Sequence, residues 1–178
     1  MKKHLSLLLL LVSLSFFAQN KAVTKVYIVR HAEKMTDDPK EKDPVLTAKG
    51  TERAKALSQI LRKKQIEAIY STDYKRTKAT GQSTANDHEL SIQPYDSRNL
   101  KKAIPTILEK NNGKTILIVG HSNTVLETVE AAGGVKPFTT IADEDYNNLF
   151  LVTIKANGTV KVKAMKYGAE NKLEETTK

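Results

Sequence analysis

The chain has 178 residues, of which 28% are charged and 39% hydrophobic, and these proportions are typical of a soluble globular domain with its own core. It contains no cysteine, which excludes disulfides, a thiol nucleophile and thiolate metal ligands. The formal net charge is +9, but the lysines are scattered and only 6% of residues are aromatic. This pattern favours a solvated surface that attracts anionic substrates, and we expect no nucleic-acid partner.

The N-terminal segment is typical of a secretory signal peptide. A basic start, Met1-Lys2-Lys3, precedes an apolar run over residues 5–17, and Ala18 offers a small residue for cleavage. The run is short for a membrane span, and a lipoprotein anchor would need a cysteine. We therefore expect a signal peptide over residues 1–18, a periplasmic or secreted location and no stable membrane anchor. An N-terminal anchor that stays attached is the alternative.

Strand and helix patterns alternate along the rest of the chain. Apolar runs predict strands at 23–29, 66–70, 91–95 and 115–119. Helical spacing predicts helices at about 47–64, 74–85, 100–109 and 123–132, with Thr47 as the first N-cap. Two last strands, 148–154 and 159–167, flank the hairpin signal Asn157-Gly158.

This order of elements predicts one domain over residues 19–167, followed by a polar, disordered tail over 168–178. Because strands alternate with helices, we expect an α/β fold, a three-layer α/β/α sandwich with a mainly parallel central sheet.

Cationic and imidazole side chains follow three of the predicted strands. Arg30 and His31 end the first strand, Arg76 follows the second, and His121 follows the strand at 115–119. Ligands of such sheets bind at the carboxyl ends of the strands, so we expect these groups to converge on one anion. A neutral imidazole can attack phosphorus, while arginines grip the non-bridging oxygens. Backbone N–H groups at the helix start near Ser122 would add to the anion site.

The pattern therefore predicts phosphoryl transfer through a histidine nucleophile. Two arginines and two imidazoles already supply the positive charge that a divalent ion would bring, so we expect no metal and no cofactor. The acidic clusters Asp37-Asp38 and Asp143-Glu144-Asp145 are interpreted as solvated loops.

Four segments in order over residues 23–167 resemble the motifs of the histidine phosphatase superfamily. They are Arg30-His31-Ala32, Leu46-Thr47-Ala48-Lys49-Gly50, the stretch from Ser71 through Arg76 to Thr80, and Gly120-His121-Ser122. The resemblance implies the phosphoglycerate mutase-like fold, His31 as the phosphorylated nucleophile, and a phosphate pocket completed by Arg30, Arg76 and His121. It implies a phosphatase that acts on phosphomonoesters or phosphohistidine, with a phosphorylated small molecule or a phosphoprotein as substrate.

Two alternatives stay open beside the phosphatase. One is a phosphoglycerate mutase-type phosphotransferase, although the chain is short and resembles the small phosphatase branch more. The other is an inactive family member that binds phosphorylated ligands.

The sequence leaves the general acid open. The family usually places a glutamate after the third strand, and residues 95–100 contain none. Asp96 lies nearest to that place and is the candidate acid, although its position also suits a turn or a helix cap. Glu33 and Asp143 are the alternatives.

Overall fold

The structure is a computed structural model that describes residues 23–170, so the expected signal peptide over 1–18 and residues 171–178 of the expected tail lie outside the described residues. Each predicted strand and helix is present, with shifted ends, and the structure adds one short 3-10 helix, η1. In chain order the elements are β1 (Thr24–Arg30), α1 (Ala48–Leu61), β2 (Ala68–Ser71), α2 (Lys75–Asp87), β3 (Ile92–Pro94), η1 (Ser97–Asn99), α3 (Leu100–Lys110), β4 (Thr115–Gly120), α4 (Val125–Ala131), β5 (Asn148–Ile154) and β6 (Val160–Lys166).

The described strands form one six-stranded sheet in the order β3-β2-β4-β1-β5-β6. The first four strands of this order pair in parallel, whereas β5 and β6 pair antiparallel at one edge. The β5–β6 hairpin turns at Gly158, whose φ of 80° lies in the left-handed region that glycine adopts without a steric cost. The mainly parallel sheet is therefore confirmed, with an antiparallel extension.

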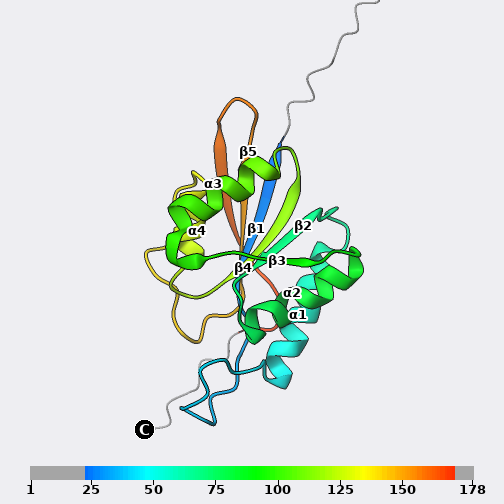
Figure 1. Cartoon of the computed structure of the whole chain (residues 1–178), viewed down its shortest axis with the longest axis vertical. Helices are drawn as coiled ribbons and strands as arrows, with labels where there is room; N and C mark the ends of the chain where they lie inside the picture. Colours follow the sequence, from blue (N-terminus) through cyan, green and yellow to red (C-terminus); the bar gives the residue numbers. More distant parts are fainter. Residues whose placement is uncertain (1–22, 171–178) are drawn as a thin grey trace, which may run out of the picture.

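Helices cover both faces of the sheet and give the expected three layers. One apolar core packs Leu57 and Leu61 of α1 against β1, β2 and β4. The other packs α3 and α4 on the opposite face, through residues such as Ile104 and Val129. Figure 1 shows α3 and α4 on one side of the strands and α1 and α2 on the other. Because both faces are covered, the central strands carry unbroken apolar runs, Val26–Val29 in β1 and Ile116–Val119 in β4.

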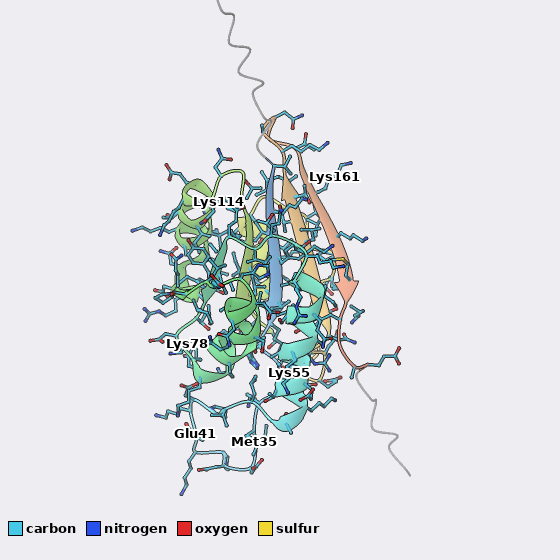
Figure 2. The ribbon with its side chains drawn as sticks, turned by 90° about the vertical axis from the view of Figure 1, so that its right-hand side faces the viewer. Met35, Glu41, Lys55, Lys78, Lys114 and Lys161 are labelled. Atoms are coloured by element: carbon cyan, nitrogen blue, oxygen red, sulfur yellow. The ribbon has the colours of Figure 1, made fainter. Side chains whose placement is uncertain are left out.

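The loop between β1 and α1 is closed at its base. A single antiparallel bridge joins Lys34 to Leu46, and Thr47 caps α1 by accepting a hydrogen bond from the Gly50 backbone N–H at 2.9 Å. Figure 2 places Met35 and Glu41 of this loop at one end of the molecule, far from Lys114 and Lys161. The loop therefore lies at the end of the sheet where β1 and β4 terminate.

In the part of the chain that the structure describes, the helices are all too short or too polar to cross a membrane.

Gly50 is the point where α1 touches the segment after β1. A Cβ at Gly50 would lie 2.2 Å from the Glu33 carbonyl oxygen, so we expect Gly50→Ala to lower the free energy of unfolding by at least about 2 kcal/mol. Gly81 of α2 is a matched control, because a Cβ there meets its neighbours at 3.5 Å or more, in ordinary contact. Gly81→Ala should be neutral or stabilising by up to about 1 kcal/mol, as is usual for a helical Gly→Ala change. Chemical denaturation of both variants tests this, and equal stabilities would contradict it.

Candidate active site

The two strand-terminal histidines lie side by side because β1 and β4 are parallel neighbours. Their register pairs Arg30 with Gly120, and the His31 backbone N–H donates to the Gly120 carbonyl at 2.9 Å. The next residue on each strand is a histidine, and the centroids of the two rings are 5.4 Å apart. The predicted convergence of His31 and His121 is thus present in the structure.

His31 is held as a neutral imidazole with one known tautomer. Its Nδ1 lies 2.8 Å from the Ala32 carbonyl oxygen, and because a carbonyl only accepts, Nδ1 carries the hydrogen. Burial lowers the pKa of His31 to about 3, and the positive charges of Arg30 and Arg76 contribute to the shift. Nε2 therefore keeps its lone pair at neutral pH, as a nucleophile requires.

Arg30 is buried, and its hydrogen bonds go to backbone carbonyl oxygens. Its Nη1 donates to the carbonyl oxygens of Ala142 and Asp143 at 3.1 and 2.7 Å, and its guanidinium lies 4.1 Å from the centroid of the Tyr146 ring. Burial lowers the pKa of Arg30, but an arginine stays charged. Within the described structure the Arg30 Nε has no hydrogen-bond partner. The cation is therefore fixed in place while its charge is only partly compensated.

Arg76 comes from the first turn of α2 and mirrors this arrangement. Its guanidinium lies 4.4 Å from the Tyr74 ring centroid, and Nη1 lies 3.4 Å from an oxygen of Asp43. The Arg76 Nε is also buried without a partner among residues 23–170. Two arginines, each stacked on a tyrosine, thus flank the two imidazoles.

His121 packs edge-on against the Tyr74 ring at 5.2 Å, and its Nε2 lies 2.9 Å from the Thr72 hydroxyl oxygen. Burial, together with the positive charges of Arg76 and Arg30, lowers the pKa of His121 to about 4. Both imidazoles are therefore neutral in this site at pH 7.

These side chains line one cavity of about 680 Å³ at the carboxyl ends of β1, β2 and β4. Its charged and polar residues, Ser122 included, are suited to an anion larger than phosphate alone. The lining residues are Arg30, His31, Lys34, Thr36, Tyr74, Arg76, Ser97, Arg98, His121, Ser122, Asn123, Thr124, Asp143 and Tyr146. Among the described residues, no group of three or more acidic or histidine side chains is placed to hold a metal ion.

A sequence profile of the family described as histidine phosphatase superfamily (branch 1) matches residues 26–97. This span contains Arg30, His31 and Arg76, and the structure adds His121 to them from β4. Over residues 26–97 the chain is therefore similar to the histidine phosphatase superfamily.

Solved structures share the fold of this chain at low sequence identity. The protein histidine phosphatase SixA in complex with tungstate is 17% identical with a TM-score of 0.62, and the match covers 80% of this chain and 96% of SixA. Bacillus stearothermophilus YhfR is 18% identical, with a TM-score of 0.64 over 78% of this chain and 95% of YhfR. A phosphoglycerate mutase from Bacillus anthracis str. Sterne is 13% identical, with a TM-score of 0.62 over 83% of this chain and 94% of the mutase. No curated protein matches the sequence.

The structure does not bring Asp96 to the two histidines of this site. Asp96 caps η1 by accepting from the Arg98 backbone N–H at 2.9 Å, and its carboxylate pairs with the Arg98 side chain at 2.9 and 3.0 Å. These hydrogen bonds lower the pKa of Asp96, which disfavours the protonated form that a general acid needs. Asp96 does not line the cavity, so the geometry supports the helix cap and not the acid.

Glu33 also points away from the cavity. Its carboxylate forms a two-oxygen pair with Arg53 at 2.8–3.0 Å. Burial alone would raise the pKa of Glu33, but the hydrogen bonds and charge of Arg53 outweigh it and lower that pKa. Arg53 also donates to the Tyr167 and Ala169 carbonyls, so the first residues of the expected tail are attached to α1. Glu33 is therefore part of a structural ion pair.

Asp143 is the one carboxylate among the described residues that line the cavity. Its side chain is 95% exposed, and one oxygen lies 3.9 Å from Arg30 Nη2. Of the three carboxylates considered from the sequence, Asp143 alone can reach a group bound in the cavity.

Sequence reasoning missed Tyr74, Tyr146 and Thr72. Tyr74 and Thr72 lie inside the segment that carries Arg76, and this closeness in sequence could have identified them as site residues. Tyr146 contacts Arg30 across more than 100 residues, on a loop that had no motif.

The neutral state of both site histidines can be tested by NMR. Because burial disfavours the cation, we expect the ring resonances of His31 and His121 to stay constant from pH 8 down to about pH 5, since their pKa values are about 3 and 4. His31→Asn and His121→Asn assign the signals. Titration of either ring with a midpoint between pH 6 and 7 would contradict the burial argument.

Proposed function

We propose that this chain is a metal-independent phosphatase that works through a phosphohistidine on His31. The observation that carries the proposal is the His31 Nδ1–H to Ala32 hydrogen bond, which leaves a bare Nε2 between two guanidiniums and a second imidazole. An imidazole with one nitrogen committed and the other exposed to a cationic pocket is an in-line nucleophile for phosphorus.

The reaction runs in two displacements. His31 Nε2 forms a bond to phosphorus while the bond from phosphorus to the leaving group breaks, and the leaving group takes a proton from Asp143, the carboxylic acid that lines the cavity. Arg30 and Arg76 neutralise the charge on the equatorial oxygens in the transition state. Water then attacks phosphohistidine, the P–N bond breaks, and inorganic phosphate leaves with His31 restored as a neutral ring.

The substrate is a phosphorylated small molecule or a phosphoprotein. The similar folds include a protein histidine phosphatase and a phosphoglycerate mutase, so the fold is compatible with both classes. The Asp143 side chain is exposed to solvent. This exposure favours substrates whose leaving group needs little protonation, such as the imidazole of phosphohistidine, at least as much as substrates that release an alkoxide. The basic and apolar start of the chain supports action in the periplasm or outside the cell.

The covalent intermediate is the decisive test. Brief reaction with ³²P-labelled phosphoramidate, quenched in alkali, should leave label on His31, and His31→Ala should lose label and at least about 10³-fold in turnover. His88→Ala is the matched control, because His88 lies at the end of α2 outside the cavity. If His31→Ala keeps wild-type labelling, the covalent route through this residue is wrong.

The position of the proton donor predicts a substrate-dependent loss. If Asp143 protonates the leaving group, Asp143→Asn should slow hydrolysis of glycerol phosphate by about 10²-fold or more and that of p-nitrophenyl phosphate much less, because p-nitrophenolate leaves without a proton. Asp96→Asn should leave both rates near wild type, since its carboxylate caps η1. Equal losses on both esters in Asp143→Asn would indicate that Asp143 acts in substrate binding. A loss confined to glycerol phosphate in Asp96→Asn would identify Asp96 as the general acid.

A further inference from the structure

A chain of two buried threonine hydroxyls ends on His121. Thr72 follows β2 and Thr77 lies in the first turn of α2, and both are shielded from solvent. The Thr72 hydroxyl lies 3.0 Å from the Thr77 hydroxyl and 2.9 Å from His121 Nε2. The Thr77 hydroxyl in turn lies 2.8 Å from the Thr72 carbonyl and 2.9 Å from the Tyr74 carbonyl.

The two backbone carbonyls that contact Thr77 fix the direction of every hydrogen bond between Thr77, Thr72 and His121. Carbonyl oxygens only accept, so the single hydroxyl hydrogen of Thr77 is committed to them. The Thr77 oxygen can then only accept, and it takes the hydroxyl hydrogen of Thr72. With that hydrogen used, the Thr72 oxygen faces His121 as an acceptor, and His121 Nε2 must carry a hydrogen.

We propose that Thr72 is a positioning residue that, anchored by Thr77, holds His121 as the Nε2–H tautomer. The role for catalysis rests on the proposed phosphatase function, whereas the tautomer itself does not. The two site histidines then carry their hydrogens on opposite nitrogens, Nδ1 in His31 and Nε2 in His121.

This tautomer decides how His121 meets a phosphoryl group. Nδ1 is the nitrogen left for the ligand, and in the neutral ring it is an acceptor, as a phosphoryl oxygen is. A hydrogen must therefore lie between them, brought by the phosphate or taken from solvent. The charged and titratable groups that face His121 are Arg76, Arg30, His31 and Tyr74, and of these the two arginines disfavour a cation on His121.

¹⁵N NMR of the unliganded protein at pH 7 tests the tautomer directly, because protonated and bare imidazole nitrogens have widely separated shifts. We expect a protonated Nε2 and a bare Nδ1 in His121, with the reverse in His31. Thr72→Val and Thr77→Val should each move His121 toward the Nδ1–H form or a mixture, while Thr72→Ser keeps the wild-type pattern. Ser71→Ala is the matched control, since the buried Ser71 hydroxyl donates to the Thr72 carbonyl without touching His121.

Kinetics and anion binding test the positioning role. Thr72→Val should lower kcat/KM and weaken inhibition by vanadate about 10–100-fold, the range known for partners that orient metal-bound histidines. Thr72→Ser should restore most of it. In a His121→Asn background, Thr72→Val should cost nothing further, because its effect passes through His121.

A bare Nε2 in wild-type His121, or a Thr72→Val loss that persists in full in the His121→Asn background, would overturn the proposal. Should no phosphate ester or phosphoramidate be hydrolysed while the ¹⁵N shifts behave as expected, the phosphatase function fails and the positioning of His121 by Thr72 stands.

Discussion

The parallel pairing of β1 with β4 is the constraint on which the site depends. Arg30 and Gly120 are partners in that register, so the residues that follow them leave the sheet at the same height. The strands on either side, β2 and β5, hold this pair in the middle of the sheet, where helices bury both faces. A shift of one residue in the register would turn every side chain of β1 to the opposite face and separate the histidines.

The partners of each arginine decide whether its charge is used within the fold or stays available to a bound anion. Arg53 has a carboxylate and two carbonyls around it, so its charge and donors are consumed in tying the segment after His31 to α1 and to Tyr167. Arg30 is instead held by two carbonyls and a tyrosine ring, with an Asp143 oxygen 3.9 Å away, and Arg76 by a ring and an Asp43 oxygen at 3.4 Å. Neutral or weak partners orient a guanidinium without cancelling its charge, which is what an anion pocket needs.

Sequence reasoning reached the sheet, the helices and the four cationic or imidazole groups because each depends on local order. A polar residue that follows an apolar strand lies at the carboxyl edge of a parallel sheet, and this rule predicts the positions of His31 and His121. The assignment of Asp96 as the acid depended on its distance in sequence from the third strand. Its partner Arg98, two residues on, captures the carboxylate instead. The contacts of Tyr146 and Arg53 join segments more than 100 residues apart and carry no local pattern.

The two imidazoles of the site carry their hydrogens on opposite nitrogens, and their hydrogen-bond partners account for this difference. A carbonyl acceptor at Nδ1 gives His31 a bare Nε2, and a hydroxyl whose hydrogen is committed elsewhere gives His121 a bare Nδ1. The unliganded site thus contains two imidazole nitrogens with lone pairs and two guanidinium cations. One of the two nitrogens, His121 Nδ1, can accept a proton when an anion binds. In the proposed reaction, a phosphate monoester that enters as a monoanion brings that proton, which His121 can take at Nδ1. The phosphoryl group then faces His31 without a proton of its own, between an imidazolium and two guanidiniums, and His31 Nε2 remains the lone pair in position to attack.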